Sequence, residues 1–143
     1  MVTIRRAEPA DAADIARLNL AFNDLRTTVE HIAAQLADAS HVERVYVAEV
    51  DGSVVGLASL RLLPQALDTV PYAELSELYV DEAYRHAGVG RALVRHIEAE
   101  ARAAGAPQMV LLTSWRNTNA HAFYHALGYR LYTVTMRRPL DSD

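Results

Sequence analysis

Residues 78–93 are the most informative about the fold and read Leu78-Tyr79-Val80-Asp81-Glu82-Ala83-Tyr84-Arg85-His86-Ala87-Gly88-Val89-Gly90-Arg91-Ala92-Leu93. An apolar run ends, a turn follows, and two glycines begin a helical repeat of apolar residues. The first N–H groups of a helix have no partner within it and can bind an anion. Gly88 and Gly90 have no β-carbon to keep a phosphate off the backbone, and two arginines flank them. The pattern predicts a strand, a phosphate-binding turn and a helix, although a tight turn with arginines on a solvated face would read the same way.

Two other phosphate-binding motifs do not fit this turn. A dinucleotide fingerprint needs a third glycine where Leu93 stands, and it normally follows the first strand of a fold. A P-loop needs Gly-Lys followed by Ser or Thr, and this stretch has no lysine. Both motifs are therefore set aside.

Outward from this turn, turn residues separate the chain into regular elements. Asp51-Gly52 predicts a tight hairpin turn, and Asp11 and Asp14 predict a cap and an acidic first helical turn. We expect strands over residues 3–6, 45–50, 54–60, 73–80, 109–113 and 129–137, and helices over residues 11–24, 28–38, 88–104 and 117–127. The order βααβββαβαβ predicts an α/β (α+β) fold: one mixed sheet of six to seven strands with about four flanking helices. The strands on either side of the long helix should be parallel.

Composition limits the classes of protein to consider. A chain of 143 residues that is 51% hydrophobic predicts one domain spanning residues 1–143. The absence of cysteine excludes disulfides, thiolate zinc sites and a catalytic thiol. His121 and His125 have a spacing that suits a metal, but no third ligand is evident, and we expect no metal. The net charge of −4 argues against nucleic acid as a partner, and no apolar run is long enough for a membrane span, so we expect a cytoplasmic protein.

A second informative stretch reads Trp115-Arg116-Asn117-Thr118-Asn119-Ala120-His121-Ala122-Phe123-Tyr124-His125-Ala126-Leu127-Gly128-Tyr129. Arg-x-x-Gly-x-Gly after Leu-Tyr-Val, followed downstream by Asn-x-x-Ala-x-x-Phe-Tyr-x-x-Leu-Gly-Tyr, resembles the GCN5-related N-acetyltransferase (GNAT) family. The resemblance covers nearly the whole chain, and two motifs in the right order are more specific than either alone. It implies the GNAT fold and acetyl-CoA as the co-substrate.

The resemblance also implies which residues contact the coenzyme. The pyrophosphate would lie on the backbone of Arg85, His86, Ala87, Gly88, Val89, Gly90, Arg91 and Ala92. The backbone of Leu78, Tyr79 and Val80 would pair with the pantetheine arm as an added strand. In the family this strand splays from the one after the long helix, here residues 109–113, to admit the thioester. Asn117 resembles the asparagine that bonds the pantetheine region, and Tyr124 the tyrosine beside the coenzyme sulfur.

Acetyl transfer to an amine needs a neutral nucleophile. For an amine with a pKa near 10.4, the free base at pH 7 costs about 3.4 pH units, roughly 4.6 kcal/mol, unless the site supplies a base. Glu74 and Glu77 are the candidate bases, and Glu74 is favoured because it lies where family members that acetylate lysine carry theirs. Strict alternation puts the two on opposite faces of the strand unless a bulge intervenes, and either could instead be a solvated or ion-paired carboxylate. Tyr124 is expected to donate a hydrogen bond to the departing sulfur.

These expectations combine into one function and one alternative. The function is direct transfer of the acetyl group of acetyl-CoA, in a ternary complex, to a primary amine of a small molecule, a peptide N-terminus or a lysine. The alternative is a non-catalytic coenzyme A-binding regulatory module of the same fold. The acceptor is expected to be selected by residues 23–28, residues 64–71 and the last strand, and that strand could also pair across a homodimer.

Overall fold

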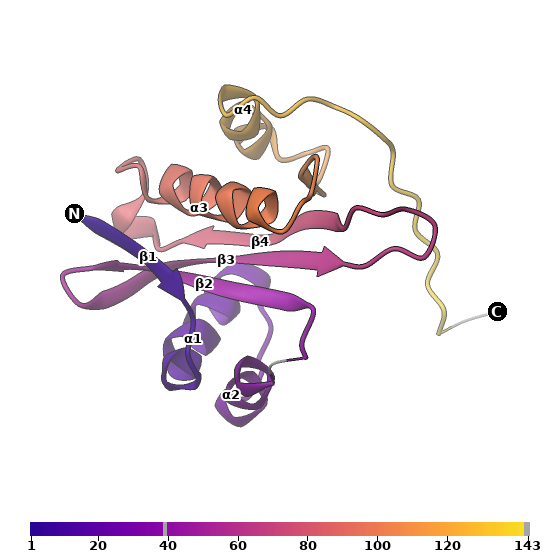
Figure 1. Cartoon of the computed structure of the whole chain (residues 1–143). Coiled ribbons are helices and arrows are strands. Elements are labelled where there is room, and N and C mark those ends of the chain that lie inside the picture. Colours follow the sequence, from indigo (N-terminus) through magenta and orange to yellow (C-terminus); the bar gives the residue numbers. More distant parts are fainter. Residues whose placement is uncertain (39, 142–143) are drawn as a thin grey trace. The chain divides into compact units, whose positions relative to one another are not determined.

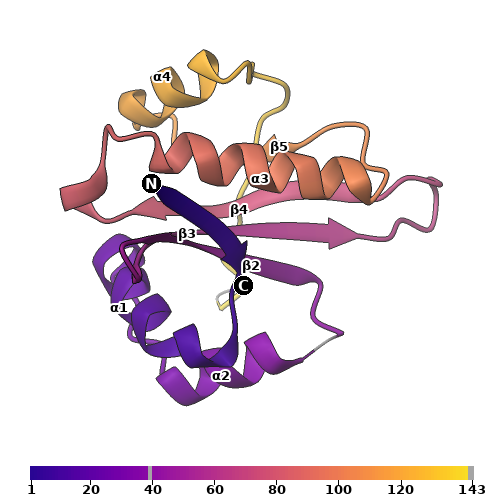
Figure 2. The ribbon, with the colours of Figure 1, turned by 60° about the vertical axis from the view of Figure 1, so that its left-hand side comes forward.

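The computed structural model describes residues 1–38 and 40–141, which fall into two units, residues 1–111 and the residues from Leu112 onward. Figure 1 shows both units and labels most of their elements, and Figure 2 also labels β5. The first unit holds one sheet and three of the helices, and the second holds a single helix within irregular chain. Each unit is described by itself.

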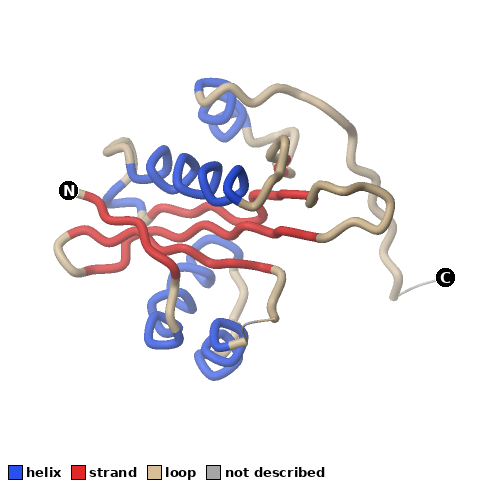
Figure 3. Tube along the Cα trace, viewed as in Figure 1, coloured by secondary structure: helices blue, strands red, loops and turns tan. Residues whose placement is uncertain are grey.

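The sheet of the first unit has five strands in the order β1-β2-β3-β4-β5 (Figure 3). Their bounds are Val2–Arg6, Glu43–Val50, Ser53–Leu63, Tyr72–Val80 and Val110–Leu111. β1 to β4 pair antiparallel, and β4 and β5 pair parallel on either side of the long helix, as the sequence predicted. The hairpin between β2 and β3 is also confirmed, because Asp51 and Gly52 have φ values of 50° and 80°.

Helices cover both faces of this sheet (Figures 1 and 2). α1 (Ala12–Asn23) and α2 (Val29–Ala37) lie on one face, and α3 (Val89–Ala103) lies on the other. Ile15 and Leu18 of α1 belong to a buried cluster with Val47 and Leu57 of the sheet. On the other face, α3 buries an apolar stripe completely, because its residues repeat at helical spacing: Leu93, Val94 and Ile97. Both faces of the sheet therefore carry a core.

The start of α1 differs from the prediction in how Asp11 acts. Asp11 stands at the N-cap position, after the short helix η1 (Pro9–Asp11), but its side chain does not cap α1. It accepts two hydrogen bonds of 2.8 Å from the Arg5 guanidinium of β1 and one of 2.7 Å from the backbone N–H of Glu8. A charged bidentate partner competes better for the carboxylate than a backbone amide does. Asp11 therefore ties α1 to β1.

The second unit contains α4 (Thr118–Ala126), which begins where the sequence predicted. The Asn117 side chain caps this helix by accepting a hydrogen bond of 3.0 Å from the backbone N–H of Ala120. The last strand expected over residues 129–137 is absent from the described residues, and the sheet has five strands rather than six or seven. Alternating apolar residues favour a strand, but a strand forms only where its backbone pairs with a neighbour. The alternating side chains are instead exposed: Leu131 91%, Val134 87% and Met136 91%.

β5 is also shorter than the strand predicted over residues 109–113. Its ladder with β4 consists of two pairs, Glu74 with Val110 and Leu75 with Leu111. Directly after Leu75, β4 has a register shift against β3, so that Ser76 is the extra residue between the partners of Leu60 and Ser59. A bulge bends a strand and interrupts its pairing, so the parallel ladder ends where the bulge begins.

Candidate active site

A pocket of about 260 Å³ lies in the first unit between α1, α2 and the sheet. Its floor is apolar and belongs to the core of that face, whereas its wall carries amides, imidazoles and two carboxylates. The lining residues used below are Phe22, Asn23, His31, His41, Glu43 and Glu77. An apolar cavity with a few convergent polar groups is the usual form of a small-molecule site.

The bulge in β4 decides which carboxylates face this pocket. Glu74 pairs with Arg61 of β3, and Glu77 pairs with Ser59 of the same strand. Residues two apart in a strand share a face, and so do residues that pair across strands. Glu74 and Glu77 therefore lie on the same face of the sheet, the face that α1 and α2 cover. Strict alternation would have separated them.

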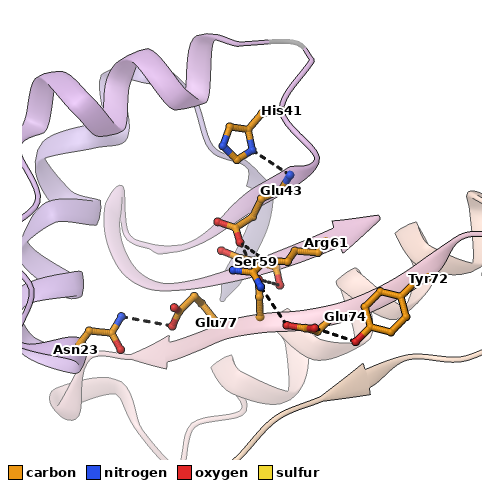
Figure 4. A network of polar contacts seen from close by, with 9 residues as sticks. Asn23, His41, Glu43, Ser59, Arg61, Tyr72, Glu74 and Glu77 are labelled. Atoms are coloured by element: carbon orange, nitrogen blue, oxygen red, sulfur yellow. Dashed lines mark hydrogen bonds and ion pairs between the residues drawn. The ribbon is translucent and has the colours of Figure 1, made fainter. Parts of the chain in front are cut away.

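Glu74 is engaged by its neighbours and does not line the pocket. It is 7% exposed, accepts a hydrogen bond of 2.9 Å from the Tyr72 hydroxyl and lies 3.4 Å from the Arg61 guanidinium. Arg61 also bonds Glu43 of β2 at 2.8 Å, and the Ser76 hydroxyl donates to the same Glu43 oxygen at 3.1 Å. Figure 4 shows this chain of contacts across three strands.

Glu77 is the less satisfied carboxylate. Among the described residues, it accepts one long hydrogen bond, of 3.4 Å, from the Asn23 amide of α1 (Figure 4). Burial raises the pKa of the Glu77 carboxyl above its ordinary value, and the nearby Glu43 acts in the same direction, against Asn23 and Arg61. A carboxylate with free lone pairs and a raised pKa is suited to accept a proton.

The edge of β4 next to Glu77 is open on the side toward β5. Beyond Leu75, β4 has no strand partner on this side among residues 1–38 and 40–141. The backbone of Leu78, Tyr79 and Val80 thus has no strand partner on this side within the first unit. An unpaired edge of this kind can accept an extended ligand as an added strand.

The turn after β4 presents a helix start with an unusual backbone. η2 (Glu82–Tyr84) leads to His86 and Gly88, which have φ values of 62° and 83° in the left-handed region. Gly88 is the N-cap of α3, and a β-carbon placed on it would meet no atom within 4 Å. No side chain caps the start of α3, so its first N–H groups have no partner from the N-cap residue, as an anion cradle requires.

Side chains connect this turn to the open edge of β4 and to the pocket. Arg85 is exposed, donates a hydrogen bond of 3.0 Å to the Val80 carbonyl and places its guanidinium 5.3 Å from the centre of the Tyr79 ring. The Tyr79 ring in turn lies 5.0 Å from that of Phe22, which lines the pocket. The open edge, the turn and the pocket thus meet along the last four residues of β4.

Tyr124 and Asn117 belong to the second unit. The Asn117 oxygen is used as the cap of α4, so its amide nitrogen is the group left for a ligand. Tyr124 lies in α4 with its ring 5.1 Å from Phe123 and 5.8 Å from Tyr129. Burial raises the pKa of the Tyr124 hydroxyl to about 12, so the phenol stays protonated near neutral pH.

Three polar residues of this region were not found from the sequence. Glu43 and Arg61 stand just outside the strands predicted over residues 45–50 and 54–60, so the sequence did not indicate that they face each other across β2 and β3. His41 precedes β2, and no sequence pattern singled it out. Its Nδ1 atom lies 3.0 Å from the backbone nitrogen of Glu43 and accepts that N–H. The pairing of charges on adjacent strands becomes visible only when the strand register is known.

Two general features of the described residues concern metals and membranes. Within residues 1–38 and 40–141, no cluster of three or more His, Asp or Glu side chains is arranged to hold a metal ion. In the same part of the chain, every helix is too short or too polar to cross a bilayer.

Comparison with known proteins gives matches over nearly the whole chain. The family model of the acetyltransferase (GNAT) family matches residues 12–129. An aminoglycoside N(6')-acetyltransferase type 1 from Stenotrophomonas maltophilia is 34% identical over 97% of this chain and 94% of its own. A solved acetyltransferase from Trypanosoma brucei has a TM-score of 0.83 at 25% identity over 98% of this chain and 100% of its own. An aminoglycoside acetyltransferase from a soil metagenomic sample, solved with sisomicin, has a TM-score of 0.81 at 20% identity, covering 97% and 96% of the two chains, and shares the fold. The protein belongs to the GNAT family and is an N-acetyltransferase.

Proposed function

We propose that this enzyme transfers the acetyl group of acetyl-CoA directly to a primary amine of a small cationic molecule held in the pocket between α1, α2 and the sheet. The observation that carries the proposal is the state of Glu77. It lines the pocket, keeps free lone pairs and has a raised pKa, whereas Glu74 is bound by Tyr72 and Arg61. Glu77 is therefore favoured over Glu74 as the base.

The residues of the first unit fit the coenzyme. The open backbone edge at Leu78, Tyr79 and Val80 suits the amide-rich pantetheine arm, and it leads into the left-handed turn at His86 and Gly88. The N–H groups of residues 86–91 suit a diphosphate, whereas those of Arg85 and Ala92, which the sequence also predicted for it, already donate to the Glu82 and Gly88 carbonyls. When bound, the coenzyme supplies an activated acetyl thioester. Glu77 directly precedes this edge in β4, so the pocket and the open edge lie next to each other along the same strand.

The chain's own residues handle the protons of the reaction. Glu77 takes a proton from the acceptor ammonium, and the neutral amine then attacks the thioester carbon. The amide C–N bond forms, the C–S bond breaks, the proton still on nitrogen passes to solvent, and coenzyme A leaves as a thiolate that takes up a proton. Tyr124, with its pKa of about 12, acts as a hydrogen-bond donor to the negative charge that develops on sulfur. Asn117 contributes its amide nitrogen to the pantetheine region. The chain has no cysteine to carry the acetyl group, which supports direct transfer.

The character of the acceptor follows from the pocket and from the relatives. Glu43 and Glu77 are acidic, and Phe22 gives the wall an apolar surface. Such a lining suits a small organic cation better than a protein lysine, which would need an open groove. A relative that is 34% identical is named for acetyl transfer to aminoglycosides. Aminoglycosides and related polyamines are therefore the first acceptors to test.

Thiol release from acetyl-CoA in the presence of aminoglycosides, polyamines and short peptides tests this function. We expect turnover with small cationic amines, and we expect Glu77→Gln to lower kcat/KM by about 10²–10⁴-fold. Glu74→Gln is the matched control, since it also removes a carboxylate from the same face of β4, and it should cost far less. Tyr124→Phe should lower kcat while coenzyme A still binds.

The alternative function gives a different result in the same assay. A regulatory module would bind coenzyme A in a calorimetric titration and would release no thiol with any acceptor. Equal losses of kcat/KM in Glu77→Gln and Glu74→Gln would still support an enzyme but would reject Glu77 as its base. A thermal melt of each variant separates loss of activity from loss of fold.

A further inference from the structure

We propose that Arg61 is a positioning residue that binds Glu43 and Glu74 together and so leaves Glu77 as the carboxylate of the described pocket that is open to an ammonium group. The inference rests on the proposed function and deepens it. It explains why three glutamates on one face of the sheet do not act alike. It also predicts that a residue on β3, with no place in the reaction, sets the working pH range of the enzyme.

The first step of the argument is the register of the three strands. Glu43 of β2 pairs with Arg61 of β3, and Arg61 pairs with Glu74 of β4. The three residues form a row across the sheet on the face that α1 and α2 cover. Arg61 reaches both neighbours, with Nε 2.8 Å from Glu43 and Nη1 3.4 Å from Glu74. One planar guanidinium thus forms ion pairs with two carboxylates.

The second step is the hydrogen bonding of each carboxylate. Glu43 Oε2 accepts from Arg61 and from the Ser76 hydroxyl, and Glu74 accepts from Arg61 and from the Tyr72 hydroxyl. Ser76 is the extra residue of the bulge, so the distortion that turns Glu77 toward the pocket also supplies a donor to Glu43. Glu77 has no such pair of donors among the described residues and keeps lone pairs for a ligand.

The third step is the balance of charge around Glu77. The positive charge of Arg61 favours the ionised form of Glu77, and the negative charge of Glu43 disfavours it. Removal of Arg61 should therefore make Glu77 more basic, and removal of Glu43 should make it less basic. The charged and titratable groups that surround Glu77 come from each neighbouring element: His31 of α2, His41 before β2, Glu43 of β2, Arg61 of β3 and Glu74 of β4.

Two variants with opposite expected effects test the proposal. Arg61→Met removes the positive charge and should raise the protonation midpoint of Glu77 by about 0.5–1 pH unit. Glu43→Gln removes the negative charge and should lower this midpoint by a similar amount. Arg61→Lys keeps the charge and should restore a midpoint close to that of the wild type. Arg102→Met, at an exposed position near the end of α3, is the matched control and should leave the midpoint unchanged.

The measurement is a ¹³C titration of the Glu77 carboxyl in the free protein, assigned with Glu77→Gln, together with the acid limb of kcat/KM. Opposite shifts for Arg61→Met and Glu43→Gln are the expected result. Shifts in the same direction, or no shift in either variant, would overturn the proposal. If Arg61→Met does not fold, Glu43→Gln and Arg61→Lys still decide it. The carboxyl titration needs no turnover, so opposite shifts in a protein that releases no thiol would reject the proposed function and retain the role of Arg61.

Discussion

At Glu77, the burial that makes the carboxylate a better base also makes the folded protein less stable at neutral pH. A carboxyl whose pKa is raised by folding contributes most to stability below the unfolded pKa, near 4.5, and this contribution is lost as the pH rises through the folded pKa. Above that pH the folded state holds a partly buried negative charge beside Glu43. In the proposed function, the basicity of Glu77 therefore comes at some cost in stability.

The pH dependence of stability follows from this sign. Glu77→Gln should raise the free energy of unfolding at pH 7 by less than about 1 kcal/mol, because the side chain is partly exposed and its field is screened. The gain should disappear as the pH falls below about 4.5, where Glu77 is protonated in both states. Denaturant unfolding at pH 7 and pH 4 measures it. A variant that is less stable than the wild type at pH 7 would show that Glu77 has a structural partner.

At the scale of single elements, the two ends of α3 provide a matched pair of glycines. Gly88 precedes the helix with φ 83°, and Gly105 follows it with φ 90°, and a β-carbon at either would meet no atom within 4 Å. Alanine at each position should therefore cost about the same, roughly 1–2 kcal/mol of backbone strain. Only Gly88 lies in the proposed diphosphate cradle.

We therefore expect Gly88→Ala to weaken coenzyme A binding by about 10-fold or more, and Gly105→Ala to leave the Kd unchanged at a similar loss of stability. Isothermal titration with coenzyme A and a thermal melt of both variants measure these two quantities. Equal Kd values for the two variants would place the diphosphate away from the start of α3.

The ion pair between Arg5 and Asp11, which joins β1 to α1, also acts at the scale of whole elements. The Arg5 guanidinium, its bidentate bond to Asp11 and the Glu8 amide fix the entry into the helix that forms one wall of the pocket. Arg5 holds the pKa of the Asp11 carboxyl below its ordinary value of 3.8. A lowered carboxyl pKa contributes stability above the unfolded pKa and loses it as the pH falls through the folded pKa.

Asp11→Ala should consequently lower the free energy of unfolding at pH 7 by about 1–3 kcal/mol, because Arg5 loses its bidentate partner and keeps Glu49, and the Glu8 N–H loses its acceptor. The difference from the wild type should shrink as the pH falls below about 3.8. Urea unfolding at pH 7 and pH 3 checks both statements, and Asp14→Ala, an exposed acid on the same helix, is the control. A loss that does not change with pH would mean that packing, and not the ion pair, stabilises this junction.

At the scale of the whole molecule, the elements that the sequence predicted well are those with local signals. The Asp51-Gly52 turn and the apolar repeat of α3 each depend on neighbours within one turn, and both were confirmed. The strand over residues 129–137 and the full length of β5 depend on a distant backbone partner, and alternation alone could not supply it.

The features of the candidate site also divide into those with a local sequence signal and those that depend on distant strands. The turn at residues 85–92 and the open edge of β4 were predicted from a contiguous motif. The bulge at Ser76 and the row formed by Glu43, Arg61 and Glu74 join residues from three strands, so they depend on register. Without the register, Glu74 was the favoured base, whereas the geometry favours Glu77.

A crystal structure with coenzyme A and an amine acceptor from the panel tests the account as a whole. We predict that the amine nitrogen lies in the pocket within hydrogen-bond distance of the Glu77 carboxylate, with the diphosphate on the backbone N–H groups of residues 86–91. An amine held by Glu74, or one bound outside the pocket between α1, α2 and the sheet, would contradict it.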